Sequence, residues 1–107
     1  MHVFGIDVGG SGIKGAIVDV VSGKLVTERK RLPTPPGAKP EDVAKVIKEL
    51  LEMHNWSGSV GIGFPSVVIS GVIHTAANID SGWIGINGET FLHEVTGCPV
   101  YALNDAD

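Results

Sequence analysis

The stretch FGIDVGGSGIKGAIVD, residues 4–19, decides how this chain can fold. A short apolar run at residues 3–8 ends at Gly9 and Gly10, and a second run rich in Ile and Val follows directly at residues 13–21. Apolar runs of this length on both sides of a glycine turn are typical of two buried strands joined by a hairpin. We therefore predict strand, turn and strand, and not the strand, turn and helix of Walker or dinucleotide-binding loops.

The residues that follow extend this hairpin into a mixed sheet. The tripeptide SGK at residues 22–24 predicts a reversal into a third strand at residues 25–32, which completes an antiparallel three-strand meander. Four prolines make residues 33–40 a connector. Apolar side chains then recur at helical spacing over residues 41–54, and a strand at residues 59–63 packs under that helix.

The last third of the chain predicts a small hairpin and a second helix–strand unit. Two short apolar runs, residues 67–69 and 72–75, flank a Ser-Gly turn. A helix is expected at residues 88–96, capped by Asn87 and stopped by Gly97, before a final strand at residues 100–103. The fold class is therefore α/β.

Composition limits the classes of protein to which the chain can belong. With 107 residues, 43% of them hydrophobic, it can form one compact domain, residues 1–107. A net charge of -4 argues against a nucleic-acid partner, and no apolar run is long enough for a membrane partner. The single cysteine, Cys98, excludes an internal disulfide, and we expect a cytoplasmic protein.

The glycine turn has the composition of a phosphate-binding loop. Glycines let several backbone N–H groups approach one anion, and a hydroxyl and a lysine add further donors. The residues expected to bind phosphate are Asp7, Gly9, Gly10, Ser11, Gly12 and Lys14, with Asp7 also holding Mg²⁺ directly or through water. The alternative is a plain glycine hairpin with a solvent-facing lysine. An ionised Asp7 inside an apolar strand argues against that alternative, because burial of a lone carboxylate is costly.

A second acidic group follows the last predicted strand. Asp105 is a candidate general base for a hydroxyl that attacks phosphorus, and Asn104 beside it can bind the same hydroxyl; an Asx-rich turn is the alternative. Pro65 ends another strand and either shapes the same crevice or forms a plain turn. Asn78 shares a polar loop with Trp83, an aromatic residue that either flanks a sugar or belongs to the core.

The remaining polar residues give weaker signals. Arg29, Lys30 and Arg31 lie on a predicted strand whose side chains alternate between faces, so we interpret them as a solvated edge. The four histidines have no spacing typical of metal ligands.

Several motifs together resemble the amino-terminal domain of the ROK family of sugar kinases and repressors. They are FGIDVGGSGIKGAIVD, GIGFPSVVISGVIHTAANID, WIG and NDAD, and the resemblance covers nearly the whole chain. HTAANID with WIG is most similar to members that phosphorylate glucose at its 6-hydroxyl with polyphosphate, ATP or both. The resemblance implies a ribonuclease H-like, actin-like ATPase domain.

The resemblance also implies roles for individual residues. Asp105 matches the catalytic base, Asn104 and Asn78 match sugar-contacting positions, and the glycine turn matches the phosphate loop. Family kinases carry a second lobe with further ligands, so we expect little or no kinase activity from this chain alone. Two alternatives are a half-domain that pairs with its own copy as a homodimer and a fragment of a sugar-sensing regulator. The regulators usually begin with a helix-turn-helix, whereas here strand-like sequence begins at Val3.

Overall fold

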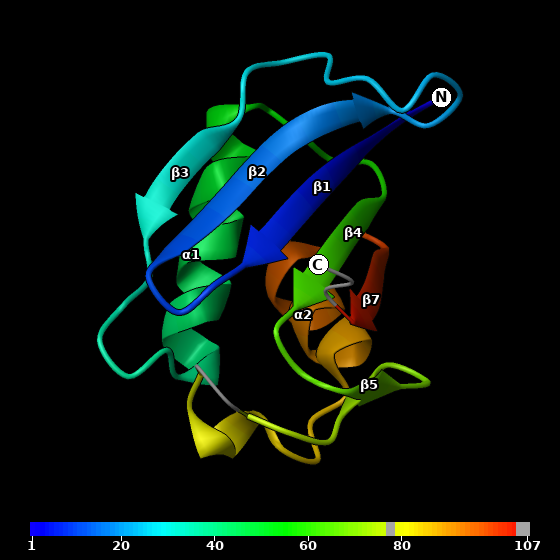
Figure 1. Ribbon diagram of the computed structural model, residues 1–107. Helices are drawn as coiled ribbons and strands as arrows, with labels where there is room; N and C mark the ends of the chain where they lie inside the picture. The colour runs from blue at the N-terminus through cyan, green and yellow to red at the C-terminus, as the bar shows by residue number, and fades with distance from the viewer. Residues whose placement is uncertain (77–78, 105–107) are drawn as a thin grey trace.

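The structure is a computed structural model that describes residues 1–76 and 79–104, with the backbone alone at residues 103 and 104. Every element predicted from the sequence is present (Figure 1). The strands are β1 (His2–Val8), β2 (Gly12–Asp19), β3 (Lys30–Pro33), β4 (Val60–Phe64), β5 (Val68–Ile69), β6 (Val72–Ile73) and β7 (Val100–Asn104). The helices are α1 (Pro40–Met53), α2 (Gly88–Thr96) and the short 3-10 helix η1 (Ser81–Trp83).

Five strands form one mixed sheet in the order β3-β2-β1-β4-β7. β1, β2 and β3 pair antiparallel, which confirms the predicted meander. β4 pairs parallel to β1, and β7 pairs parallel to β4, so β1, β4 and β7 all point the same way. α1 leads into β4 and α2 leads into β7 as the two predicted helix–strand units. β5 and β6 form the separate small hairpin.

The predicted bounds of the second and third strands are wrong at the turn between them. β2 ends at Asp19 because the Asp19 carboxylate accepts a hydrogen bond from the Val21 amide at 2.9 Å, which bends the chain. β3 begins later than predicted, at Lys30. Before it, the Thr27 hydroxyl accepts the hydrogen bond of the Ile17 amide at 3.0 Å, so a side chain takes the place of a strand carbonyl. Side chains that bind nearby backbone compete with a regular ladder in this way.

Both helices begin and end as local chemistry dictates. α1 begins at Pro40, where a missing N–H costs nothing, and Asn55 adopts a φ of 50° just beyond the helix. The Asn87 side chain caps α2 by accepting a hydrogen bond from the Thr90 amide at 3.1 Å, and Gly97 ends it with a φ of 75°. No helix in the described part of the chain is long and apolar enough to cross a membrane.

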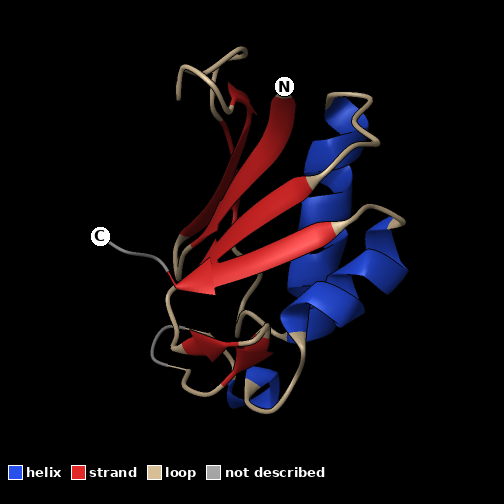
Figure 2. Cartoon of the chain, turned by 90° about the vertical axis from the view of Figure 1, so that its right-hand side faces the viewer, coloured by secondary structure: helices blue, strands red, loops and turns tan. Residues whose placement is uncertain are grey.

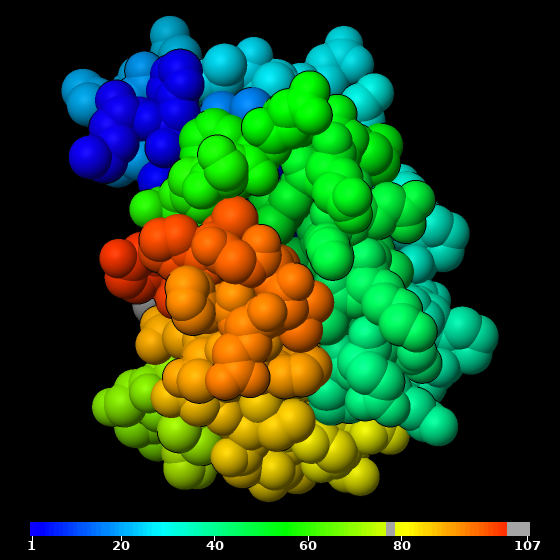
Figure 3. Space-filling view, turned by 180° about the vertical axis from the view of Figure 1, so that it is seen from behind, coloured from blue at the N-terminus to red at the C-terminus, as the bar shows by residue number. Residues whose placement is uncertain are grey.

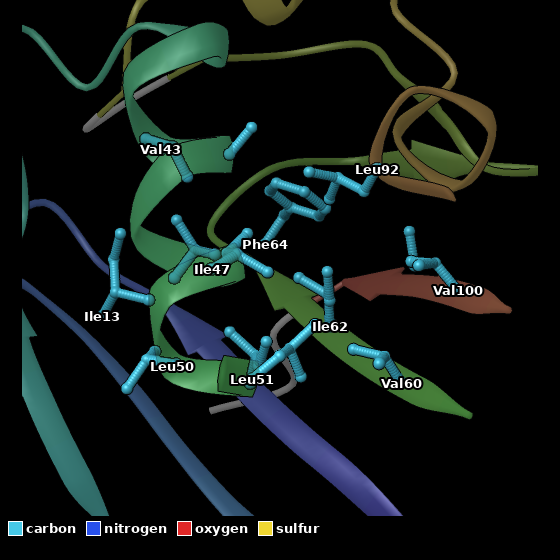
Figure 4. Packing of buried hydrophobic residues seen from close by; sticks show 14 of the residues in the cluster. Ile13, Val43, Ile47, Leu50, Leu51, Val60, Ile62, Phe64, Leu92 and Val100 are labelled. Atoms are coloured by element: carbon cyan, nitrogen blue, oxygen red, sulfur yellow. The ribbon is translucent and has the colours of Figure 1, made fainter. Parts of the chain in front are cut away.

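The core lies between the sheet and the two helices. α1 and α2 pack side by side on one face of the sheet (Figures 2 and 3). Strand side chains alternate, so β1 turns Phe4, Ile6 and Val8 toward the helices, and Ile47 and Leu50 of α1 meet them. The residues labelled in Figure 4 come from α1, α2, β2, β4 and β7 and include Ile13, Val43, Leu51, Val60, Ile62, Phe64, Leu92 and Val100.

The opposite face of the sheet carries no helix in the described part of the chain (Figure 2). The residues that point there include small ones, Gly5, Ala16 and Gly61, which lie opposite each other on β1, β2 and β4. We call this surface the open face. It also carries Asp7 and Lys14, two of the residues predicted to bind phosphate.

Candidate functional site

The candidate site lies at one edge of the sheet, where the parallel strands end. The glycine loop, residues 9–11, follows β1, and Pro65 follows β4. The register places Asp7 opposite Gly63, and the end of β4 opposite Asn104, the last residue of β7. Ligands of open α/β sheets bind beyond the carboxyl ends of such strands. The topology therefore brings together the strand ends that carry the predicted site residues.

The glycine loop is closed by one backbone bond and is held from outside by two residues. The Gly9 amide donates to the Gly12 carbonyl at 2.9 Å. The Ser11 carbonyl accepts from Arg31 Nη2 at 2.8 Å, and the Gly9 carbonyl accepts from the Thr34 hydroxyl at 2.6 Å. The Gly9 and Ser11 carbonyls are thus bound by Arg31 of β3 and by Thr34, the residue that follows β3, and β3 lies beside the loop in Figure 1.

The amides at the tip of the loop have no such partners. Within residues 1–76 and 79–104, neither the Gly10 nor the Ser11 amide donates a hydrogen bond. Both groups belong to residues exposed to solvent. Successive backbone N–H groups left unpaired in a turn form a concave site that binds anions. The loop therefore has the donors that a phosphate requires.

A hollow of about 210 Å³ joins the predicted residues. Its lining includes every residue expected to bind phosphate, together with Pro65 and Arg31. The residues that line it are Asp7, Val8, Gly9, Gly10, Ser11, Gly12, Lys14, Arg31 and Pro65. The structure therefore brings the phosphate loop and the end of β4 to one surface.

Asp7 is exposed, which corrects the expectation that the apolar strand would bury it. Its neighbours Ile6 and Val8 point toward the helices, so alternation turns Asp7 to the open face. The cost of burying a charge therefore does not indicate a ligand at Asp7. The location of Asp7 at the hollow favours one, because a solvent-accessible carboxylate beside a candidate phosphate site can bind a hydrated Mg²⁺.

Three charged residues form a row across the first three strands. Asp7 lies opposite Lys14, and Lys14 lies opposite Arg31. Directly opposite residues project from the same face, and like charges in that position repel each other. Within this described row, two cations and one carboxylate leave one positive charge in excess, although the whole chain carries a net charge of -4. This local excess favours an anionic ligand.

Arg31 and Thr34 are site residues that the sequence interpretation missed. We interpreted the basic run around Arg31 as a solvated edge, and Arg31 is indeed exposed, but its guanidinium reaches the glycine loop. The available signal was cross-strand register: a three-strand meander places one residue of β3 opposite Lys14. Because the start of β3 was predicted too early, the sequence did not show which residue that is.

Some predicted sugar-side residues can be located and others cannot. Pro65 lines the hollow, and the backbone of Asn104 ends β7 at the same edge of the sheet. Asn78 and Asp105 lie outside the described residues. No group of three or more carboxylate, histidine or cysteine side chains that could hold a metal occurs among the described residues. Among the described residues that line the hollow, Asp7 is the one carboxylate, and a Mg²⁺ held there would need phosphate oxygens and water as its other ligands.

Trp83 belongs to the core and not to a sugar site. Its side chain is 0% exposed, and its indole N–H donates to the Ala38 carbonyl at 2.8 Å. The rings of Phe64 and Phe91 lie 5.2 and 5.9 Å from it, centroid to centroid. Asp80 caps η1 by accepting from the Gly82 amide at 2.8 Å. This aromatic cluster supports the site indirectly, because Phe64 ends β4 directly before Pro65.

Known proteins match this chain over nearly its whole length. The ROK family model matches residues 3–107. The polyphosphate glucokinase of Mycobacterium tuberculosis is 51% identical over 107 residues, which are 99% of this chain and 40% of that protein. The inorganic polyphosphate/ATP-glucomannokinase of Arthrobacter sp. strain KM superposes with a TM-score of 0.93 at 41% identity, covering 99% of this chain and 45% of that one.

A third relative is a ROK family glucokinase from Streptomyces griseus, solved in complex with glucose and AMPPNP. It superposes with a TM-score of 0.84 at 25% identity, covering 99% of this chain and 34% of that one. The chain thus spans less than half the length of the relatives it matches. The mixed sheet and these neighbours confirm the predicted fold, which is the actin-like ATPase fold of ROK sugar kinases. The chain belongs to the ROK family.

Proposed function

We propose that this chain is the amino-terminal domain of a glucokinase that transfers phosphate from polyphosphate, ATP or both to the 6-hydroxyl of glucose. The observation that carries the proposal is the hollow at the glycine loop, which gathers all the predicted phosphate-binding residues. Similarity to enzymes named polyphosphate glucokinase and polyphosphate/ATP-glucomannokinase supports the choice of donor and of a hexose acceptor.

On the donor side, the loop and its cations neutralise the phosphate that is transferred. The amides of Gly10 and Ser11 donate to its oxygens, and the Lys14 ammonium supplies a positive charge. Asp7 would hold a Mg²⁺ ion, which when bound would supply Lewis-acid stabilisation of the phosphate oxygens. Phosphoryl transfer needs chiefly positioning and charge stabilisation, and these residues provide both.

On the acceptor side, Asp105 takes the proton from the 6-hydroxyl as its oxygen attacks the terminal phosphorus. The new oxygen–phosphorus bond forms while the bond from that phosphorus to the rest of the donor breaks. Asn104 and Asn78 bind and orient the sugar, and Pro65 shapes the crevice between loop and sugar. Glucose 6-phosphate and a donor shortened by one phosphate leave the site.

A second lobe is needed to complete this site. The matched relatives are more than twice as long as this chain, and the loop residues Gly10 and Ser11 at the hollow are exposed to solvent. Phosphoryl transfer requires both substrates to be fixed in line and screened from water. We therefore propose that residues 1–107 alone transfer phosphate weakly or not at all.

A chimera tests this function. Residues 1–107 would replace the matching part of the Mycobacterium tuberculosis polyphosphate glucokinase, and glucose 6-phosphate would be measured with polyphosphate and with ATP. We expect an active chimera, about 10²–10⁴-fold loss of kcat in Asp105→Asn, and no product from the 107-residue chain alone. A chimera that folds but makes no product, or full activity in Asp105→Asn, would contradict the proposal. Product from the chain alone at a rate similar to that of the chimera would show that no second lobe is required.

A further inference from the structure

Arg31 reaches the glycine loop from a different strand. It lies on β3, twenty positions beyond Ser11, and its Nη2 donates to the Ser11 carbonyl at 2.8 Å. Its side chain is exposed and lines the same hollow as Lys14 and the loop. A guanidinium has five N–H donors arranged in a planar fork, and the Ser11 carbonyl uses one of them. Further donors are therefore available at the mouth of the hollow.

Gly12 provides the space in which the guanidinium lies. A Cβ atom built on Gly12 would clash with Nε of Arg31 and would lie 2.7 Å from both Cζ and Nη2. Gly12 has no positive φ, so its backbone conformation does not require glycine. With Arg31 in its observed position there is no room for a Cβ at residue 12, so a larger residue would displace the flexible guanidinium. Gly12 thus has a packing reason to be glycine that involves one specific side chain.

Thr34, the residue directly after β3, makes a second connection to the glycine loop. Besides its hydroxyl bond to the Gly9 carbonyl, its amide lies 3.4 Å from the Ser11 carbonyl. These bonds hold the loop carbonyls on the β3 side, while the Gly10 and Ser11 amides stay unpaired within the described residues. The β3 segment therefore fixes the loop in a conformation that suits an anion.

Arg31 brings a second positive charge to the hollow, beside Lys14. It lies directly opposite Lys14, which also lines the hollow. Like charges opposite each other across two strands destabilise a sheet. Local conflicts of this kind are concentrated at functional sites, where the ligand resolves them.

We infer that Arg31 binds the phosphate donor, with its guanidinium bridging the Ser11 carbonyl and an oxygen of a bound phosphate group. This inference deepens the proposed function and depends on it. Arg31 contacts the ligand directly, and it also fixes the loop whose amides contact the same phosphate. The ligand class is a chain of at least two phosphates, for which tripolyphosphate is a simple probe.

The test compares two arginines that differ in position but not in charge. Arg29 lines a separate hollow on the open face, which shares Asp7 and Lys14 with the first but does not include the glycine loop. Tripolyphosphate affinity of the 107-residue chain would be measured by calorimetry for wild type, Arg31→Met, Arg31→Lys and Arg29→Met. We expect about tenfold weaker binding for Arg31→Met, an intermediate loss for Arg31→Lys, and less than twofold change for Arg29→Met.

Gly12→Ala provides a second test of whether Arg31 contributes to tripolyphosphate binding. Its new methyl group displaces the guanidinium, so the double variant with Arg31→Met should bind no more weakly than Arg31→Met alone. Equal losses in Arg31→Met and Arg29→Met would overturn the inference and leave the phosphate loop intact as a proposal. Absence of binding by the wild-type chain would contradict both the phosphate loop and the role of Arg31. Thermal unfolding of each variant separates loss of binding from loss of folding.

Discussion

The two turns at the ends of β2 serve the same purpose in the fold but differ in how their polar groups are satisfied. The β1–β2 turn, residues 9–11, and the β2–β3 turn, residues 20–24, each reverse the chain between antiparallel strands (Figure 1). In the β1–β2 turn, carbonyls are bound by side chains from β3 and beyond, Arg31 and Thr34. The amides at its tip have no partner within the described residues.

The β2–β3 turn satisfies its own amides. The Val20 amide donates to the Met1 carbonyl, and the Val21 amide donates to the Asp19 carboxylate. The Gly23 amide donates to the Asp19 carbonyl at 2.8 Å, and the Lys24 amide donates to the Ser22 hydroxyl at 3.2 Å. Such a turn needs no ligand to complete its hydrogen bonds.

The difference shows how a hairpin turn becomes a binding loop. Both turns contain glycine, lysine and serine in or next to them, so composition alone does not separate them. What separates them is which groups remain unpaired and which charges lie nearby. The β1–β2 turn keeps donors for a ligand because other residues take over its acceptors. Four predictions test this comparison.

Lys14→Met should have the largest effect. Lys14 lines the hollow, and removal of its charged hydrogen-bond donor should weaken tripolyphosphate binding by about tenfold or more. Lys24→Met removes the same charge at the other turn and should leave the affinity within about twofold. Calorimetry on the two variants checks this. Equal weakening by both would mean that only overall charge matters.

Thr34→Val should weaken the same binding by a few-fold. The variant keeps the shape of the side chain and removes the hydroxyl that donates to the Gly9 carbonyl at 2.6 Å. We expect a loss of about 1 kcal/mol in the free energy of unfolding as well. Thr34→Ser keeps the hydroxyl and should restore both values toward wild type. An unchanged affinity in Thr34→Val would show that the loop holds its shape without this bond.

Gly23→Ala should lower stability without affecting phosphate binding. Gly23 has a φ of 74° and open space around its Cβ position, so the cost comes from the backbone alone and is about 1 kcal/mol. Gly61→Ala is the matched control, because Gly61 has no positive φ and its added Cβ meets nothing. Chemical denaturation measures the stability of both. A stable Gly23→Ala variant would contradict the described turn.

The smallest effect concerns the pH dependence of the β2–β3 turn. The hydrogen bond from the Val21 amide lowers the pKa of the Asp19 carboxyl below its ordinary value of 3.8. A lowered pKa in the folded state means that the ionised form adds stability above the ordinary pKa and that this stability is lost as the pH falls through the folded pKa. Titration of the carboxyl by NMR should show the lowered pKa. An ordinary or raised value would contradict the hydrogen bond.

Much of the fold followed from local patterns in the sequence. The period of apolar residues in α1, the cap at Asn87 and the stop at Gly97 act within a few residues, so the helices were predicted nearly to their ends. The β2–β3 turn was not predicted correctly, because two side-chain bonds, from Val21 to Asp19 and from Ile17 to Thr27, replace the ladder there. Strand propensity does not show whether a backbone amide binds a nearby side chain or the carbonyl of a neighbouring strand.

Of the candidate site, only the residues that are close together in the sequence could be predicted. The glycine loop was identified because its residues are adjacent in the sequence. Arg31 was missed because its role depends on strand register and on contact with Gly12 across the sheet. The exposure of Asp7 and the burial of Trp83 were not predicted for a similar reason. Tertiary structure decides which face of the sheet a strand residue points to and which residues an aromatic ring packs against.

The central claim is that the β1–β2 turn, and not the β2–β3 turn, binds phosphate. The most direct measurement is an NMR titration of the ¹⁵N-labelled chain with tripolyphosphate, following the amide signals of both turns. We predict saturable shifts of the Gly10 and Ser11 amides, with no change at Val21, Gly23 or Lys24. Equal shifts in the two turns, or no shift at Gly10 and Ser11 at saturating tripolyphosphate, would contradict the claim.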